Sequence, residues 1–255
     1  MSEDGMLTNK VALITGGGQG VGQGIGLALA KQGAHIVVTG RTLEKCETTA
    51  DMLCERGVKA LALKCDVKSI EDLQRIVEAT IKEFGQLDIL VNNAQEVARG
   101  PLLSISDDQI NGNWESGPLA TFRLMKMAYP HLKKTKGNVV NLCSSVMKRW
   151  DVGTYGVYAA VKAATQQLTR AAANEWGKDG IRVNAIMPHA KSPALAGWMK
   201  ANPVEAEHFQ ASIPLGYVGE CEDDIGAFVA MMCSDCGRYL SGQTIALDGG
   251  QVFIG

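Results

Sequence analysis

Three side chains of the kinds that move protons lie within a short stretch of the sequence: Ser145, Tyr158 and Lys162. Tyr158 and Lys162 are four residues apart, so on a helix they share a face, with Cβ atoms roughly 5–6 Å apart. A free tyrosine has a pKa of about 10, and an ammonium about 5 Å away stabilises its phenolate by roughly 3 kcal/mol at an effective dielectric constant of about 20. The spacing predicts a tyrosine that exchanges a proton with a bound molecule, beside a serine hydroxyl that holds the reacting oxygen. An exposed helical pair without chemistry is the plain alternative.

A glycine-rich turn near the amino end is the second chemical feature. The apolar run Val11–Thr15 has the length of a strand, and it leads directly into GGGQGVG at residues 16–22 and then into a helical pattern. Glycines let the backbone approach a pyrophosphate, and the start of a helix presents free N–H groups and a positive dipole end. The order strand, glycine turn, helix favours a nucleotide-phosphate site over a merely flexible turn.

Alternating strands and helices must position these residues. Near-continuous apolar strands between amphipathic helices are typical of a parallel sheet that is covered on both faces, with ligands at the carboxyl ends of the strands. We predict an α/β fold: a single doubly wound Rossmann-type domain over residues 1–255, with a seven-stranded parallel sheet flanked by helices. The predicted strands are Val11–Thr15, His35–Thr39, Ala60–Cys65, Ile89–Asn92, Asn138–Leu142, Val183–Ile186 and Thr244–Leu247. The predicted helices are 21–32, 43–56, 69–84, 107–113, 119–134, 155–177 and 222–233.

Composition argues against several classes of protein. The net charge of −2 gives no indication of a nucleic-acid partner or an anionic membrane surface. The sequence contains no apolar run near the roughly 18 residues of a membrane helix, and its first residues lack the pattern of a signal peptide. We therefore expect a cytoplasmic protein.

The cysteines indicate reduced thiols. Seven is an odd number and gives no complete disulfide framework. Cys233 and Cys236 form a Cys-x-x-Cys pair, which is a redox or zinc motif in some proteins, but no second pair or histidine cluster follows to complete four ligands. We expect no metal site.

Several motifs in order resemble those of the classical short-chain dehydrogenase/reductase family, over a span from about Leu7 to Gly255. The matching residues are Thr15, Gly16, Gly20 and Gly22 of the cofactor turn, Asn92-Asn93-Ala94 after the fourth strand, the catalytic set Ser145, Tyr158 and Lys162, Asn184, and Asp248-Gly249-Gly250. The resemblance implies a nicotinamide-dependent oxidoreductase that interconverts a carbonyl and an alcohol. It implies that Tyr158 is the acid or base, that Lys162 lowers its pKa and holds the nicotinamide ribose, and that Ser145 binds the substrate oxygen.

The end of the second strand bears on the choice of cofactor. Enzymes that use NAD usually place an acidic residue there, whereas this chain has Gly40 followed by Arg41. A guanidinium can bind a 2′-phosphate and stack on adenine, so we predict NADP(H), with NAD(H) as the alternative. Arg41 facing solvent is the other interpretation. By the resemblance, Asp66-Val67 contacts adenine and Asn93 the cofactor, although Asp66 also suits a cap of the next turn.

Three positions depart from the family pattern. Gly117 replaces an asparagine that in the family holds a water on the proton path to the lysine, and Pro118 indicates a helix start or break there. Asn113, one turn earlier, is one candidate substitute, and backbone with water is the other. Gln95 and His189 replace glycines near the expected meeting point of nicotinamide and substrate. Gln95 could donate to a substrate oxygen or fill space, and His189 could act as an acid or substrate ligand, or pack beside the cofactor.

Residues 188–217 are irregular and contain four prolines, and in the family this region forms a mobile lid over the substrate. Aromatic and sulfur-containing residues with few fixed charges border the expected pocket, which predicts an apolar substrate of cyclic or steroid-like shape. They are Met147, Trp150, Tyr155, Trp198, Met199, Phe209 and Tyr217. Of these, Trp198 is the residue that we assign to the substrate.

The sequence thus predicts an NADP(H)-dependent oxidoreductase that interconverts a ketone and a secondary alcohol. One alternative is a 3-oxoacyl carrier-protein reductase, with a basic docking patch formed by Arg123, Lys126, Lys133 and Lys134. Another is a catalytically impaired NADP-binding sensor or scaffold, which the glycine at 117 motivates. The resemblance also implies a homodimer or homotetramer that packs through helices 119–134 and 155–177, with a small carbonyl or alcohol as the other partner.

Overall fold

A parallel sheet of seven strands in the order β3-β2-β1-β4-β5-β6-β7 forms the centre of the protein. The computed structural model describes residues 5–149 and 153–253. All the predicted strands are confirmed, and some of their ends shift by a residue or two. The strands are β1 Val11–Thr15, β2 His35–Gly40, β3 Ala60–Lys64, β4 Ile89–Asn92, β5 Asn138–Leu142, β6 Arg182–Pro188 and β7 Thr244–Leu247.

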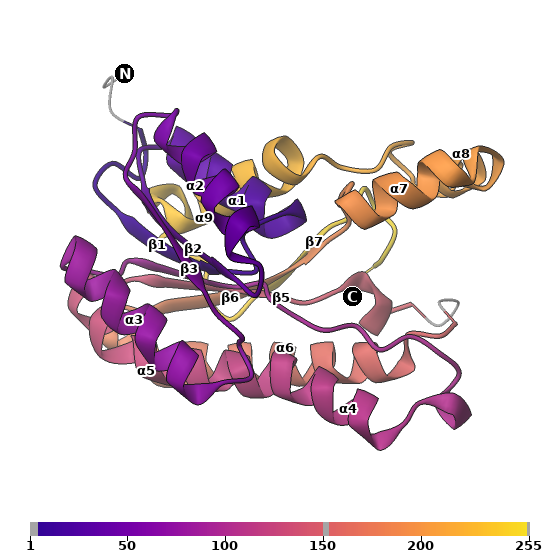
Figure 1. Ribbon diagram of the computed structural model, residues 1–255, viewed down its shortest axis with the longest axis horizontal. Coiled ribbons are helices and arrows are strands. Elements are labelled where there is room, and N and C mark those ends of the chain that lie inside the picture. Colours follow the sequence, from indigo (N-terminus) through magenta and orange to yellow (C-terminus); the bar gives the residue numbers. More distant parts are fainter. Residues whose placement is uncertain (1–4, 150–152, 254–255) are drawn as a thin grey trace.

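Helices cover both faces of this sheet, as the sequence predicted (Figure 1). On one face lie α1 Gly20–Lys31, α2 Leu43–Cys54 and α9 Ala227–Cys233. On the other lie α3 Ile70–Phe84, α5 Ala120–Thr135 and α6 Gly156–Trp176. Successive residues of a strand point to opposite faces, so Leu13 belongs to the core beneath α3 and α5, and Ile14 to the core beneath α1. Within the described chain, no helix is long and apolar enough to span a bilayer.

The winding of the chain reverses between β1 and β4. From β1 the chain proceeds outward through β2 to β3, and it then returns to β4 on the other side of β1. In open α/β sheets, this reversal leaves a crevice outside the carboxyl ends of the two strands, where ligands bind. The glycine turn after β1 and the Asn-Asn-Ala motif after β4 both lie at this crevice.

The helix α4, Asp107–Trp114, continues into α5 through a π-helical turn, Glu115–Leu119. We expected Pro118 to start or break a helix, and the structure has a kink between two helices there, within this wide turn. Gly117 departs from helical geometry, with φ −98° and ψ −105°. The widened turn accommodates the proline that a regular α-helix would not.

Residues 188–217 are more regular than expected, because they contain α7, Pro193–Ala201, and α8, Pro203–Ala211. Each of these prolines stands at the start of its helix, where a missing N–H costs nothing. The Ser192 hydroxyl accepts a hydrogen bond from Leu195 N at 3.3 Å and caps α7. Figure 1 shows α7 and α8 extending together at one end of the molecule.

Candidate active site

Thr15 and Asn93 fasten the glycine turn to the end of β4. The Thr15 hydroxyl accepts hydrogen bonds from the N–H groups of Asn93 (3.0 Å) and Ala94 (3.1 Å). The Asn93 side-chain amide donates to the carbonyl oxygens of Thr15 (2.8 Å) and Gly16 (2.9 Å). Thr15 is buried and its polar group is used in these bonds, so it positions the turn, whereas Asn93 also lines the cleft in front of it.

The glycines of the turn leave room that side chains would occupy. Gly16 and Gly20 have positive φ angles of 65° and 59°, which glycine adopts without steric cost. A Cβ atom on Gly22 would lie 2.6 Å from Gly16 O and 2.5 Å from Asn93 Nδ2. Because α1 begins at Gly20, its free N–H groups meet this space, and the turn fits the pyrophosphate of a dinucleotide.

An open cleft of about 470 Å³ lies between the turn and the neighbouring strand ends. Most of the residues predicted to bind a cofactor line it: Gly16, Gly20, Arg41, Asp66, Val67 and Asn93. Lys45, Ser116 and Ser192 also line it, and the sequence analysis did not identify them. Asp66 keeps both of the roles considered for it, since Oδ1 accepts a hydrogen bond from Lys68 N at 3.0 Å while the residue lines the cleft.

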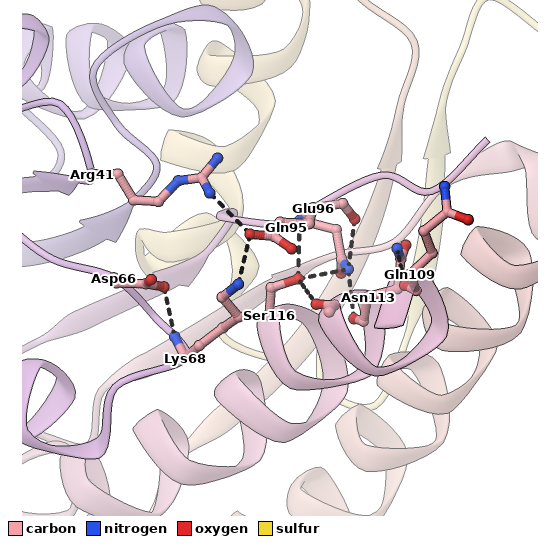
Figure 2. A network of polar contacts seen from close by, with 9 residues as sticks. Arg41, Asp66, Lys68, Gln95, Glu96, Gln109, Asn113 and Ser116 are labelled. Carbon is pink, nitrogen blue, oxygen red and sulfur yellow. Dashed lines mark hydrogen bonds and ion pairs between the residues drawn. The ribbon is translucent and has the colours of Figure 1, made fainter. Parts of the chain in front are cut away.

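One end of the cleft carries a charged cluster (Figure 2). Glu96 Oε1 accepts from Arg41 Nη1 at 2.9 Å and from Lys68 Nζ at 3.0 Å. Arg41 is well exposed, but it is ion-paired at the cleft and does not merely face solvent. Glu96 and Lys68 were not identified from the sequence. The position of Glu96, directly after the Asn-Asn-Ala segment and Gln95, is the signal that could have found it.

The predicted catalytic residues gather around the end of β5. Ser145 opens a short helical turn after that strand, and Tyr158 and Lys162 lie on α6. Lys162 is 4% exposed, and its Nζ donates to Leu142 O at 2.5 Å. The same ammonium lies 5.5 Å from the centre of the Tyr158 ring. The structure therefore places the phenol and the ammonium on one helix face, and the buried Ser145 lies in the turn after β5 that packs against this helix.

Burial dominates the electrostatics of this group. It raises the pKa of Tyr158, and a hydrogen bond with the Ser144 hydroxyl lowers that pKa by less. Burial also lowers the pKa of Lys162 to about 8. We expected Lys162 to bring the pKa of Tyr158 down, but burial raises that pKa. The reason is that the loss of hydration around the phenolate outweighs the other influences on it.

Gln95 fills the space that the absent side chain of Gly117 leaves. A Cβ atom on Gly117 would overlap Gln95 Oε1 and lie 2.8 Å from Nε2. Gln95 Nε2 donates to the carbonyl oxygens of Asn113 (2.9 Å) and Glu96 (3.0 Å). Of the two roles considered for Gln95, the structure favours filling space over donating to a substrate oxygen. Gln95 Oε1 is buried and has no hydrogen-bond partner among the described residues.

Asn113 does not stand in for the missing asparagine. Its Nδ2 donates to Gln109 O at 2.9 Å, and its Oδ1 accepts from Ala98 N at 3.2 Å. The residue is 2% exposed; its Oδ1 holds the segment after β4 against α4, whereas its Nδ2 bonds within α4. Because both ends of the side chain already bond within the protein, the structure argues against this alternative.

His189 and Trp198 come together through Phe209. The Phe209 ring meets His189 edge-on at 5.3 Å and Trp198 edge-on at 5.8 Å. Burial lowers the pKa of His189, and its Nδ1 is buried without a hydrogen-bond partner in the part of the chain described. A neutral imidazole thus joins an aromatic wall that links the end of β6 to α7 and α8.

The surroundings of Tyr158 are less apolar than we expected. The Arg99 guanidinium lies 4.7 Å from the centre of the Tyr155 ring, which is 6.1 Å from the ring of Tyr158. Met147 packs in a small cluster with Met187. Trp150, which we also placed near the pocket, lies outside the described residues.

Comparisons with known proteins identify the family of the chain. The family model described as enoyl-(acyl carrier protein) reductase matches residues 16–251. A 12alpha-hydroxysteroid dehydrogenase from Clostridium sp. is 40% identical, with 96% of this chain and 98% of that protein covered. A hydroxynaphthalene reductase-like protein from Metarhizium robertsii is 32% identical over 96% of each chain. A solved structure from Sinorhizobium meliloti 1021, described as a short-chain alcohol dehydrogenase, has a TM-score of 0.89 and 33% identity, and covers 96% of this chain and 97% of that one. The chain therefore belongs to the short-chain dehydrogenase/reductase family and is an oxidoreductase that acts on hydroxyl or carbonyl groups.

Proposed function

We propose that this oxidoreductase interconverts a ketone and a secondary alcohol, uses NADP(H), and takes an apolar substrate of cyclic or steroid-like shape. The observation that carries the reaction is the placement of the phenol, the ammonium and the serine around the end of β5. The family uses nicotinamide cofactors in general, and the glycine turn in front of α1 fits their pyrophosphate.

The roles of the three residues follow from their chemistry. A bound nicotinamide cofactor supplies or accepts the hydride. Tyr158 donates a proton to the carbonyl oxygen during reduction and accepts it during oxidation. The Ser145 hydroxyl donates a hydrogen bond to the same oxygen and stabilises its developing charge. Lys162 supplies positive charge near the phenolate and, by family resemblance, holds the nicotinamide ribose. Burial raises the pKa of Tyr158 and so keeps it protonated at neutral pH, which suits the reductive direction.

The preference for NADP(H) is supported by Arg41 at the edge of the cleft and by the absence of an acid at Gly40. A guanidinium there can bind a 2′-phosphate through several donors. Glu96 opposes this preference, because it already accepts a hydrogen bond from Arg41. NAD(H) is the alternative.

The substrate class is supported by the wall of His189, Phe209 and Trp198 and by the likeness to a 12alpha-hydroxysteroid dehydrogenase. The competing carrier-protein reductase needs a basic docking patch. One of the residues proposed for that patch, Lys133, is ion-paired with Asp179 at 2.8 Å, which weakens this alternative.

We also infer a homodimer or homotetramer that packs through α5 and α6, and a cytoplasmic location. The assembly is supported by exposed apolar and small side chains on these helices, such as Phe122. The location is supported by the cysteines, all seven of which are free thiols.

The test is oxidation of NADPH and of NADH against ketones that range from small aliphatic to steroidal, with an acetoacetyl thioester included. We expect turnover on the cyclic ketones, faster with NADPH. Tyr158→Phe should lower kcat by at least about a hundredfold, the scale of a lost general acid, while NADPH binding stays within about twofold. Cofactor binding with no turnover on any substrate would favour the sensor or scaffold, and turnover of Tyr158→Phe within tenfold of wild type would refute its assignment.

A further inference from the structure

Glu96 places a negative charge in the part of the cleft where Arg41 is expected to meet the cofactor. Arg41 follows β2 and Glu96 follows β4, and these strands flank β1 in the sheet. The ion pair between them, 2.9 Å long, therefore reaches across the end of β1 (Figure 2). Both residues line the cleft.

Lys68 holds the carboxylate in this place. Its Nζ lies 3.0 Å from Glu96 Oε1, the same oxygen that Arg41 contacts. Main-chain contacts fix the segment as well, because Glu96 N donates to the Ser116 hydroxyl at 3.0 Å. Glu96 is 30% exposed against 67% for Arg41, so the carboxylate is the better anchored partner and the guanidinium the freer one.

A 2′-phosphate would meet this carboxylate on the same cation. Both groups are anions that accept from a guanidinium, and like charges that share one partner at short range repel each other. Lys45 also lines the cleft, but its Nζ donates to Gln19 Oε1 at 2.7 Å on the side of the glycine turn. The remaining acid here is Asp66, which adds negative charge.

We propose that Glu96 is a specificity-determining residue of the nucleotide cleft, where its carboxylate competes with the 2′-phosphate for Arg41 and so weakens NADP(H) relative to NAD(H). The proposal rests on the proposed role of Arg41 as the cation at the 2′ position. It predicts that a substitution at residue 96 changes the ratio of NADPH affinity to NADH affinity without any change at the end of β2, where residues usually determine that ratio.

The test measures dissociation constants of NADPH and NADH for the purified full-length chain by fluorescence titration. Glu96→Gln keeps the shape and removes the charge. We expect NADPH to bind at least about threefold more tightly, the scale of an exposed ion pair, and NADH to change by less than twofold. The gain should shrink in high salt, which screens exposed charges. Glu222→Gln is the matched control, because Glu222 pairs with Arg56 outside the cleft at a similar exposure of 24%.

Unchanged or weaker NADPH binding would overturn the proposal, and so would equal tightening of both cofactors, which would mean only a general electrostatic effect. Weaker NADH binding would instead indicate a contact between Glu96 and the ribose, and would also overturn it. Failure of the proposed NADP(H) preference would be seen separately. Wild type would then bind NADH more tightly than NADPH, or Arg41→Ala would weaken NADPH binding no more than NADH binding. In the Arg41→Ala background, Glu96→Gln should have a clearly smaller effect on NADPH.

Discussion

At the scale of single residues, the burial of the Lys162 ammonium costs folding free energy. Lys162 is almost fully buried, and its ammonium has a carbonyl oxygen and the face of a phenol nearby, while no carboxylate of the described residues pairs with it. Burial brings its pKa to about 8, so at neutral pH the cofactor-free protein still holds a mostly charged ammonium away from water. Such a group is retained for function and not for stability.

Replacement of this lysine should therefore stabilise the cofactor-free protein while abolishing catalysis. The folded-state pKa lies below the unfolded value of 10.5, so the cost is fully present below about pH 8 and fades as the pH rises toward the unfolded pKa. We expect Lys162→Met to raise the unfolding free energy at pH 7 by on the order of 2 kcal/mol, and by clearly less at pH 9.5. Urea denaturation at the two pH values measures this difference. A destabilised variant, or a gain that grows with pH, would contradict it.

At the scale of elements, the π turn between α4 and α5 and the segment after β4 form one unit. Gln95 occupies the place beside Gly117, and the Ser116 hydroxyl accepts from Glu96 N at 3.0 Å. An asparagine at 117 and a glutamine at 95 would compete for one volume, which explains why the two departures from the family pattern occur together. Overpacking of this kind typically costs about 1–3 kcal/mol.

Gly117→Asn alone should consequently destabilise the protein by about 1–3 kcal/mol, because the new side chain displaces Gln95 from its hydrogen bonds. The double variant Gln95→Gly with Gly117→Asn should recover most of that loss, since it empties the volume that the asparagine needs. Urea denaturation of the single and double variants gives the coupling energy, which we expect to be at least about 1 kcal/mol. Additive effects of the two substitutions would show that they do not share this space.

The sequence was sufficient for the parts of the fold that have local signals. Apolar runs predicted the strands of the sheet, and the glycine turn was predicted where the structure has it, between β1 and α1. The sequence did not reveal pairs that meet only in space, such as Arg41 with Glu96 or Gln95 with Gly117, because no spacing rule connects residues on different crossovers. The helices that begin at Pro193 and Pro203 were not predicted, because proline both breaks helices and starts them, and the flanking residues decide which.

At the scale of the whole molecule, the outer faces of α5 and α6 include exposed apolar and small side chains. Phe122 on α5 is 47% exposed, and the solvent face of α6 includes the small residues Ala160 and Ala163. Small residues allow helices to approach closely, and exposed aromatics are typical anchors of protein interfaces. Lys162 projects from the opposite, buried face of α6, so an assembly through these helices would also support the helix that carries the catalytic pair.

If the proposed assembly forms through α5, Phe122→Glu should give a smaller species, because a charge in an apolar contact loses its hydration without gaining a partner. Light scattering coupled to size exclusion measures the mass directly. We expect a dimeric wild type to become a monomer in the variant, or a tetrameric wild type to become a dimer. Met52→Glu on α2 is the control, since Met52 is also exposed (36%) but lies on the other side of the sheet. A monomeric wild type would exclude the proposed assembly. An unchanged mass for Phe122→Glu would exclude α5 as part of the interface.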